Sequence, residues 1–200
     1  MSPARRTAEA TEQLRAWLVE VARCLVAREG PAALTMRALA AEARCAVGLP
    51  YKVFSSRDEL VVELVHAEFV RLKAAFEELV AAAGTGTVGA NLGRYAELLL
   101  GSPGVALAHG IHGITLDDEA SRAIGARAGE TGVVDAVATT VADYLAAEKR
   151  LGRVGPDVDE LAFGFVIAGA VHNLLVSGDP YPKPTLAQVK QMLAAVAARL

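Results

Sequence analysis

The stretch of sequence that decides the fold is TMRALAAEARCAVGLPYKVFSSRDEL, which spans residues 35–60. It begins with Thr35, a residue type that often caps the N-terminus of a helix. Apolar residues at helical spacing then predict a short helix over residues 36–43, and a break at residues 44–46 separates it from a second short segment over residues 47–54. Two short helices joined by a tight turn predict a helix-turn-helix.

The residues on both sides of this stretch supply helices that would hold it in place. A helix is expected over residues 8–28, where apolar residues recur at helical spacing until Gly30-Pro31 ends the pattern. On the other side, Ser55-Ser56 is expected to cap a long helix over residues 57–83. The major groove of B-DNA is about 12 Å wide and admits one helix, provided that a compact scaffold presents it. Residues 8–54 are expected to form that scaffold.

The rest of the chain is also predicted to be helical. We find no convincing strand and no internal repeat, and turns rich in glycine and proline separate the apolar segments. The further helices are expected over residues 90–100, 117–151 with an interruption near 129–132, 157–177 and 185–200. The sequence therefore predicts an all-α protein of about nine helices.

Composition and charge narrow the class of protein. Of the 200 residues, 53% are hydrophobic and the mean hydropathy is +0.33, which supports a packed core and excludes a disordered chain. The formal net charge is −3, but residues 1–60 carry nine Lys/Arg against seven Asp/Glu, and residues 61–200 carry eleven against sixteen. The first part is thus +2 and the remainder −5, so the N-terminal part is the one suited to phosphate groups.

No segment has the pattern of a signal peptide or a membrane span. The longest apolar run, residues 161–176, is shorter than the roughly 20 residues that cross a bilayer, and we expect it to be a helix buried on all sides. Cys24 and Cys45 fit neither a metal site nor a disulfide framework, and are expected to be reduced thiols. A cytoplasmic protein with no membrane partner, no metal and no cofactor is therefore expected.

The motif around the helix-turn-helix is more specific than its helical pattern alone. Its residues are Gly30, Leu34-Thr35-Met36-Arg37-Ala38-Leu39-Ala40-Ala41-Glu42-Ala43, Val47-Gly48, Tyr51 and Phe54-Ser55-Ser56-Arg57-Asp58-Glu59-Leu60. This pattern resembles the N-terminal motif of the TetR family of bacterial repressors, in register from Gly30 to Leu60 without a gap.

The resemblance implies a two-part protein. Residues 1–56 would form a three-helix DNA-binding domain, and residues 57–200 a larger helical domain for ligand sensing and dimerisation. The implied function is that of a ligand-responsive transcriptional repressor and not of an enzyme. It would bind a two-fold symmetric operator as a dimer and be released by a small organic effector.

The DNA-binding residues follow from the same motif. The hydroxyl of Thr35 and the N-terminus of its helix suit a phosphate, Tyr51 matches a tyrosine that contacts the backbone in the family, and Arg57 stands where the family has lysine. The full set of expected contacts is Thr35, Arg37, Arg44, Val47, Gly48, Leu49, Tyr51, Lys52 and Arg57. Arg5 and Arg6 are expected to form a disordered arm along the duplex. The alternative interpretation makes the arginines at 37 and 44 solvated surface charges and Tyr51 a core side chain.

Three positions depart from the family pattern. Arg44 replaces the turn glycine, so a left-handed backbone there would be strained. Ala46 replaces the serine that caps the recognition helix, and Leu49-Pro50 replaces Thr-Leu. Because proline removes a helical hydrogen bond, the recognition helix is expected to start later or to bend.

The C-terminal part offers candidates for an effector pocket and for a dimer interface. The polar side chains expected to contact an effector are Tyr95, His109, His112, His172 and Asn173, in a mainly aliphatic pocket. For each histidine the alternative is a partly exposed or hydrogen-bonded core residue. The homodimer is expected to form through residues 157–177 and 185–200.

Two other classes of protein remain as alternatives. An all-α enzyme is suggested by the GxGxxG pattern at residues 84–89 and by the acidic residues 117–119. However, the glycine pattern follows a predicted helix instead of a strand, and the acidic residues suit a helix N-terminus. The other alternative is a protein-interaction module whose three-helix head does not bind DNA.

Overall fold

The computed structural model describes residues 3–109, 115–177 and 183–200. Within these ranges the regular structure is entirely helical, which confirms the all-α expectation and the number of helices. The α-helices are α1 (Pro3–Glu29), α2 (Met36–Glu42), α3 (Arg57–Ala81), α4 (Val88–Leu100), α5 (Pro103–Ala108), α6 (Asp118–Thr131), α7 (Val133–Arg150), α8 (Glu160–Val176) and α9 (Leu186–Ala197). Two 3-10 helices, η1 (Pro31–Ala33) and η2 (Pro50–Lys52), flank α2.

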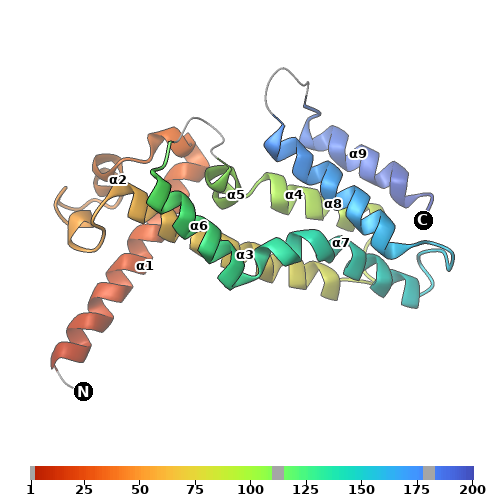
Figure 1. The fold of residues 1–200 in the computed structure, drawn as a ribbon, viewed down its shortest axis with the longest axis horizontal. Coiled ribbons are helices and arrows are strands. Elements are labelled where there is room, and N and C mark those ends of the chain that lie inside the picture. The colour runs from red at the N-terminus through yellow and green to blue at the C-terminus, as the bar shows by residue number, and fades with distance from the viewer. Residues whose placement is uncertain (1–2, 110–114, 178–182) are drawn as a thin grey trace.

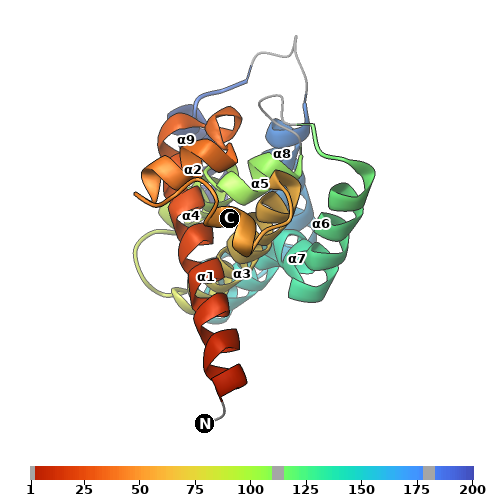
Figure 2. The same cartoon turned by 90° about the vertical axis from the view of Figure 1, so that its left-hand side faces the viewer.

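The helices are arranged around α3, which runs from the N-terminal end of the molecule through its body (Figure 1). α1 and α2 lie at one end, and α8 and α9 lie toward the other end (Figure 1). α3 contacts α1, α4, α5, α6 and α7, while α8 packs on α7 and α9 packs on α4. Figure 2 views the molecule from the end that carries α1 and α2. The core is thus shared between the small N-terminal head and the larger helical body.

The predicted helix caps are confirmed. The side-chain oxygen of Thr35 accepts a hydrogen bond from the Ala38 N–H at 3.1 Å, and that of Ser56 accepts one from the Glu59 N–H at 3.0 Å. Gly132, at φ +68°, separates α6 from α7, as the predicted interruption requires. These caps satisfy N–H groups that a helix leaves unpaired at its first turn.

One expectation about the helices is wrong: Arg5 and Arg6 do not form an irregular arm, because α1 already begins at Pro3. The expected burial of the apolar segment of α8 on all sides is only partly met within the single chain. Its one buried stripe, which includes Gly164 and Val171, packs on α7, while Phe165 on another face is 79% exposed. A helix that is apolar on every face is expected to be buried on every face, but part of that burial can be provided by a second chain.

Within the described ranges, no helix has both the length and the apolar character that crossing a bilayer requires.

The contact between α7 and α8 depends on Gly164. A Cβ atom built on this glycine would lie 2.6 Å from the Cβ of Ala142 and 2.8 Å from its backbone nitrogen. We expect Gly164→Ala to lower the free energy of unfolding by about 2–3 kcal/mol, because the two backbones must move apart. Urea unfolding at one fixed protein concentration measures the change.

Gly125 provides the matched control, because it is an exposed residue within α6. A Cβ atom added to Gly125 would meet no atom of the described residues within 4 Å, apart from the helix itself. Gly125→Ala is expected to keep or raise the stability by up to about 1 kcal/mol, as alanine favours helix over glycine. If Gly164→Ala were as stable as the starting protein, the close packing of α7 on α8 would not contribute as described.

Candidate DNA-binding surface and ligand cavity

The turn after α2 is a tight cap with a left-handed residue. The N–H of Cys45 donates to the carbonyl of Ala40 at 3.0 Å, and the N–H of Arg44 donates to the carbonyl of Ala41 at 3.1 Å. This pair of bonds is the Schellman arrangement, which places a left-handed residue directly after the helix. Arg44 occupies that position at φ +50° and is the non-glycine residue of the described ranges with positive φ. The expected left-handed turn is present, without the glycine that usually adopts it.

The segment after the turn is not the α-helix that residues 47–54 were expected to form. Proline at 50 has no N–H to donate to the carbonyl of Ala46, and this carbonyl instead accepts from the N–H of Leu49 at 2.8 Å. The following bonds, from Lys52 to Leu49 and from Val53 to Pro50, are also of the shorter 3-10 type. We refer to residues 47–54 as the reading segment. It consists of a turn followed by η2.

Replacing Arg44 by glycine should separate backbone strain from charge. We expect Arg44→Gly to raise the free energy of unfolding by up to about 1 kcal/mol, because glycine adopts the left-handed conformation without the Cβ clash. Arg44→Ala removes the same guanidinium but keeps the strain, so it serves as the control. Urea unfolding of both variants measures the difference, and an Arg44→Gly protein less stable than Arg44→Ala would contradict the strain.

Most of the predicted DNA contacts lie on the surface around the turn. The exposed residues of the set are Thr35, Arg37, Arg44, Val47, Gly48, Tyr51 and Lys52. They belong to α2, the turn and η2, at the end of the molecule seen in Figure 2. We refer to these residues as the reading surface. Tyr51 is 56% exposed, so its alternative interpretation as a core residue is not supported.

The other two residues of the predicted set are half-buried. Leu49 and Arg57 are each of intermediate exposure. The Nε of Arg57 donates to the carbonyl of Leu34 at 2.7 Å, which fixes the chain just before the cap of α2. Arg57 therefore has a structural contact that the motif alone did not reveal.

Arg15 of α1 contacts the C-terminal end of the reading segment at Val53 and Phe54. Its guanidinium donates to the carbonyl of Val53 and lies 4.6 Å from the centre of the Phe54 ring. It also pairs with Glu59 at 2.7 Å and Glu63 at 3.2 Å. We call these four contacts the Arg15 clamp. Sequence reasoning missed it, because an arginine inside an amphipathic helix has the pattern of a surface charge.

The clamp also lowers the pKa of Glu59 and is linked to α6 through Glu63. Burial alone would raise the pKa of Glu59, but hydrogen bonds from the backbone N–H and hydroxyl of Ser55 and from Arg15 outweigh burial and lower it. Glu63 is shared with Arg127 of α6, whose guanidinium lies 3.5 Å away. The head is thereby joined to the helical body through charged side chains.

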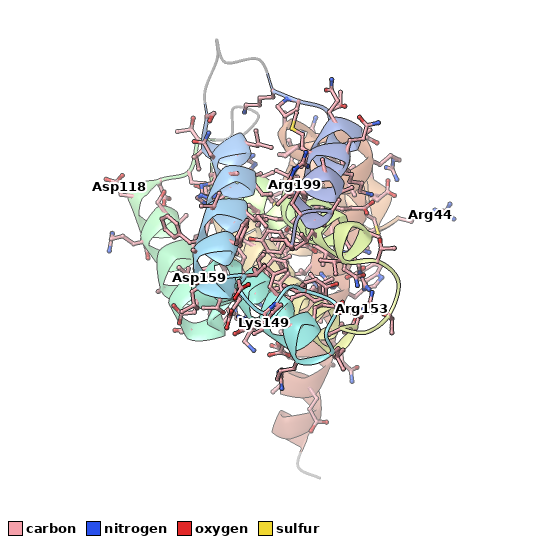
Figure 3. The ribbon with its side chains drawn as sticks, turned by 90° about the vertical axis from the view of Figure 1, so that its right-hand side faces the viewer. Arg44, Asp118, Lys149, Arg153, Asp159 and Arg199 are labelled. Carbon is pink, nitrogen blue, oxygen red and sulfur yellow. The ribbon has the colours of Figure 1, made fainter. Side chains whose placement is uncertain are left out.

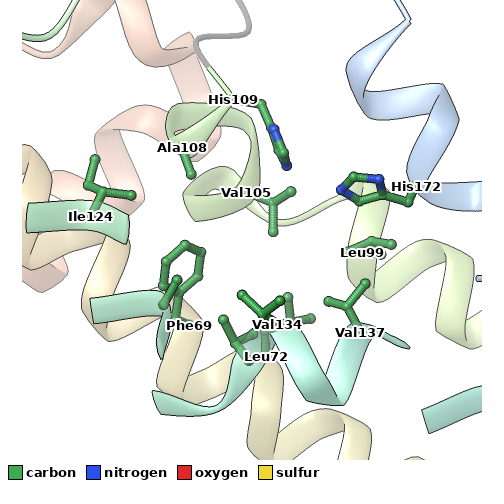
Figure 4. Close-up of a pocket in the computed structure, with 12 residues that line it drawn as sticks. Phe69, Leu72, Leu99, Val105, Ala108, His109, Ile124, Val134, Val137 and His172 are labelled. Atoms are coloured by element: carbon green, nitrogen blue, oxygen red, sulfur yellow. The ribbon is translucent and has the colours of Figure 1, made fainter. Parts of the chain in front are cut away.

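A cavity of about 320 Å³ lies in the helical body. Its wall consists of side chains from α3 to α8, namely Phe69, Leu72, Leu99, Val105, Ala108, His109, Ile124, Ala128, Val133, Val134, Val137 and His172. Figure 4 shows His109 and His172 on one side of the cavity, with Phe69, Leu72 and Val134 on the opposite side. The two imidazole rings meet edge to face with their centres 5.3 Å apart. The predicted aliphatic pocket with histidines is thus a defined space.

Two of the other predicted effector contacts, Tyr95 and Asn173, lie outside the cavity wall. Tyr95 is fully buried in the core, where its hydroxyl donates to the carbonyl of Val137 at 2.9 Å and its ring stacks on Phe76. Burial raises the pKa of the Tyr95 hydroxyl above its ordinary value. Asn173 is exposed on α8 and does not line the cavity, and His112 lies outside the described residues. Of the five candidates, His109 and His172 reach the cavity.

The patterns that suggested an enzyme have structural explanations. The glycine pattern runs from the loop after α3 into the first turn of α4, where a Cβ on Gly89 would come within 2.9 Å of the Cα of Ala194 in α9. Gly89 thus permits close packing of two helices. The side chain of Asp117 caps α6 by accepting from the Ala120 N–H at 2.7 Å.

Comparison with known protein families identifies the N-terminal region. Residues 18–64 match the family described as bacterial regulatory proteins, tetR family. The matched range begins within α1 and ends within α3, so it contains the reading surface. No protein of curated function matches the chain in sequence.

Solved structures match the whole architecture. A putative TetR-family transcriptional regulator from Mesorhizobium loti aligns with a TM-score of 0.58 at 13% identity, covering 94% of this chain and 95% of that one. A putative transcriptional regulator from Saccharomonospora viridis in complex with choline aligns at 0.57 and 20%, covering 94% and 96%. The regulator FadR from Bacillus subtilis in complex with stearoyl-CoA aligns at 0.53 and 14%, covering 90% and 95%. At these identities the matches establish a shared fold.

Proposed function

We propose that the chain, whose residues 18–64 match the tetR family of bacterial regulatory proteins, is a ligand-responsive repressor of that family. It binds a two-fold symmetric operator as a homodimer, and a small organic effector releases it. Residues 1–56 form the DNA-binding domain and residues 57–200 the domain for sensing and dimerisation. The observation that carries the proposal is the exposed reading surface, which lies within the range matched by the family.

Each part of the reading surface suits one kind of contact with DNA. Arg37, Arg44 and Lys52 are exposed cations that can neutralise phosphates, and the hydroxyls of Thr35 and Tyr51 can hydrogen-bond to them. Val47, Gly48, Leu49 and Lys52 are the candidates for contact with base edges. Arg57 supports this surface by fixing the Leu34 carbonyl, and it stands at the edge of the contact region.

The second part of the proposal is a homodimer formed by α8 and α9. Figure 3 views the molecule from the side on which these two helices lie. Their exposed apolar side chains are large for a free surface: Leu161 is 72% exposed, Phe165 79%, Val166 62%, Val176 50% and Met192 57%. A second copy that packs the same helices against them would bury this surface in a four-helix interface.

The third part of the proposal concerns the effector. A cavity of about 320 Å³ is within the size range of small-molecule sites, which is about 300–1,000 Å³. The structurally similar regulators from Saccharomonospora viridis and Bacillus subtilis are described with choline and stearoyl-CoA, respectively. By analogy, we assign the effector of this chain to the cavity that His109 and His172 border.

The experiment that tests the function is a selection of bound duplexes from a random DNA pool with the full chain. We expect a two-fold symmetric site, and log affinity for it should fall with log salt by about 0.9 per phosphate neutralised. Failure to select any sequence, or binding without salt dependence, would favour the protein-interaction alternative.

With an operator in hand, Tyr51→Ala is the sharpest single change on the reading surface. We expect about a tenfold loss of operator affinity in a gel shift, which corresponds to about 1.4 kcal/mol. Tyr51→Phe separates the ring from the hydroxyl. Arg57 is left unchanged, because removing it would also release the Leu34 carbonyl. Unaltered affinity of Tyr51→Ala would remove this tyrosine from the surface that contacts DNA.

A further inference from the structure

The lining of the cavity is almost entirely apolar. Apart from the imidazoles of His109 and His172, its side chains are those of Phe, Leu, Val, Ile and Ala. Among the described residues, the lining contains no lysine, arginine, aspartate or glutamate. A charged group placed in such a space would lose its hydration without gaining an opposite charge, which is costly. The walls therefore select against cations and anions and favour hydrocarbon.

The two histidines supply the polar contacts on one side of the cavity. His109 is the C-cap of α5 and His172 lies on α8, and Figure 4 shows both rings beside the same space. Burial and the neighbouring His172 lower the pKa of the His109 imidazole, which favours its neutral form. A neutral imidazole has one N–H donor and one nitrogen acceptor. With the His172 ring beside it, the His109 imidazole suits an uncharged polar group such as a hydroxyl, which donates and accepts, or a ketone, which accepts from the N–H.

We propose that the effector is an uncharged, largely aliphatic molecule whose single polar group is held between His109 and His172. This inference rests on the proposed function, because it names the effector class of the same cavity. The cavity volume of about 320 Å³ lies at the lower end of the range for small-molecule sites, about 300–1,000 Å³, which favours a small effector.

The test uses a series of probes that share an eight-carbon chain and differ in the head group. 1-Octanol and 2-octanone represent the uncharged class, octanoate the anions, and octylammonium the cations. Binding to the full-length protein at pH 7.5 is measured by calorimetry without DNA. We expect the two neutral probes to bind at least tenfold more tightly than either charged probe. Tighter binding of octanoate or octylammonium would overturn the proposal.

Variants of the histidines test where the head group lies. His109→Leu and His172→Leu keep apolar bulk and remove the hydrogen bonds, so each should weaken 1-octanol binding by about tenfold while hexane still binds. Ala128→Leu fills the cavity from α6 and should weaken both probes. Asn173→Ala is the matched control, since Asn173 lies on α8 next to His172 but outside the cavity wall. Wild-type octanol affinity in both leucine variants would overturn the placement.

A parallel gel shift separates this inference from the function on which it depends. If 1-octanol binds as expected but does not release operator DNA, the effector class stands and the release mechanism fails. If a charged compound of similar size releases the DNA through the cavity, the function stands and the neutral class is wrong.

Discussion

Phe165→Asp should convert the protein from a dimer, with twice the 20.8 kDa mass of one chain, to a monomer. Phe165 is 79% exposed in the single chain, so the substitution leaves the fold of that chain undisturbed. In the proposed dimer the same side chain lies in an apolar interface, where an unpaired carboxylate costs several kcal/mol. We expect the dimer dissociation constant to rise at least 1,000-fold, or about 4 kcal/mol. Sedimentation equilibrium over a range of concentrations measures it.

Two controls make this result specific to the α8–α9 surface. Val70→Asp places the same charge at another exposed apolar residue, which lies on α3 and is 50% exposed, and should leave the mass unchanged. Phe165→Leu keeps an apolar side chain and should leave a dimer. Because a monomer reaches one half-site, Phe165→Asp should also lose high-affinity binding to a two-fold operator. A dimeric Phe165→Asp protein would show that the chains associate through another surface.

The second large effect is expected at the Arg15 clamp. Arg15→Met keeps an unbranched apolar stem but removes the hydrogen bond to the Val53 carbonyl and the ion pairs with Glu59 and Glu63. The side chain is 21% exposed, so solvent screens these contacts only in part. We expect the free energy of unfolding to fall by about 2–3 kcal/mol, because the Val53 carbonyl loses its donor and two partly buried carboxylates each lose a cationic partner. Operator affinity should fall more than tenfold, since η2 loses its support.

Arg23→Met is the matched control on the same helix. Arg23 pairs with Glu20 one turn away near the surface, and such pairs contribute about 0.3–0.5 kcal/mol. Arg15→Lys keeps the charge but lacks the fork that reaches a carbonyl and two carboxylates together, so it should rescue only part of the loss. Urea unfolding and a gel shift on the same samples measure both effects. Arg15→Met behaving like Arg23→Met would mean that the clamp does not support the reading segment.

The features that were predictable from the sequence are those governed by local chemistry. Thr35 and Ser56 cap their helices, and the burial of Met36, Leu39 and Ala40 follows from their spacing on α2. The left-handed turn at Arg44 was also predictable, because the register of the motif places it where a glycine is usual. In each of these cases the residue and its immediate neighbours determine the structure.

The features that were missed depend on contacts between distant residues or on another chain. Pro50 predicted a distorted helix. The 3-10 geometry itself depends on which backbone N–H donates to each carbonyl, and the sequence does not determine this. The Arg15 clamp joins α1 to residues that lie 38 and 44 positions away. Tyr95 was expected in the pocket, yet helical spacing alone does not distinguish a side chain in the core from one in an adjacent cavity.

The position of His172 has a consequence for the time for which an effector stays bound. A groove on the outside of α7 and α8, lined by Phe165, Ala168 and Gly169 among others, shares Val134, Val137 and His172 with the cavity wall. One imidazole thus borders both the inner space and the surface that a second chain would cover. Effector exchange through that wall should then be slower in the dimer than in the monomeric Phe165→Asp protein, even where the equilibrium affinities are equal. The rate at which the protein responds to a fall in effector concentration would then depend on its state of association.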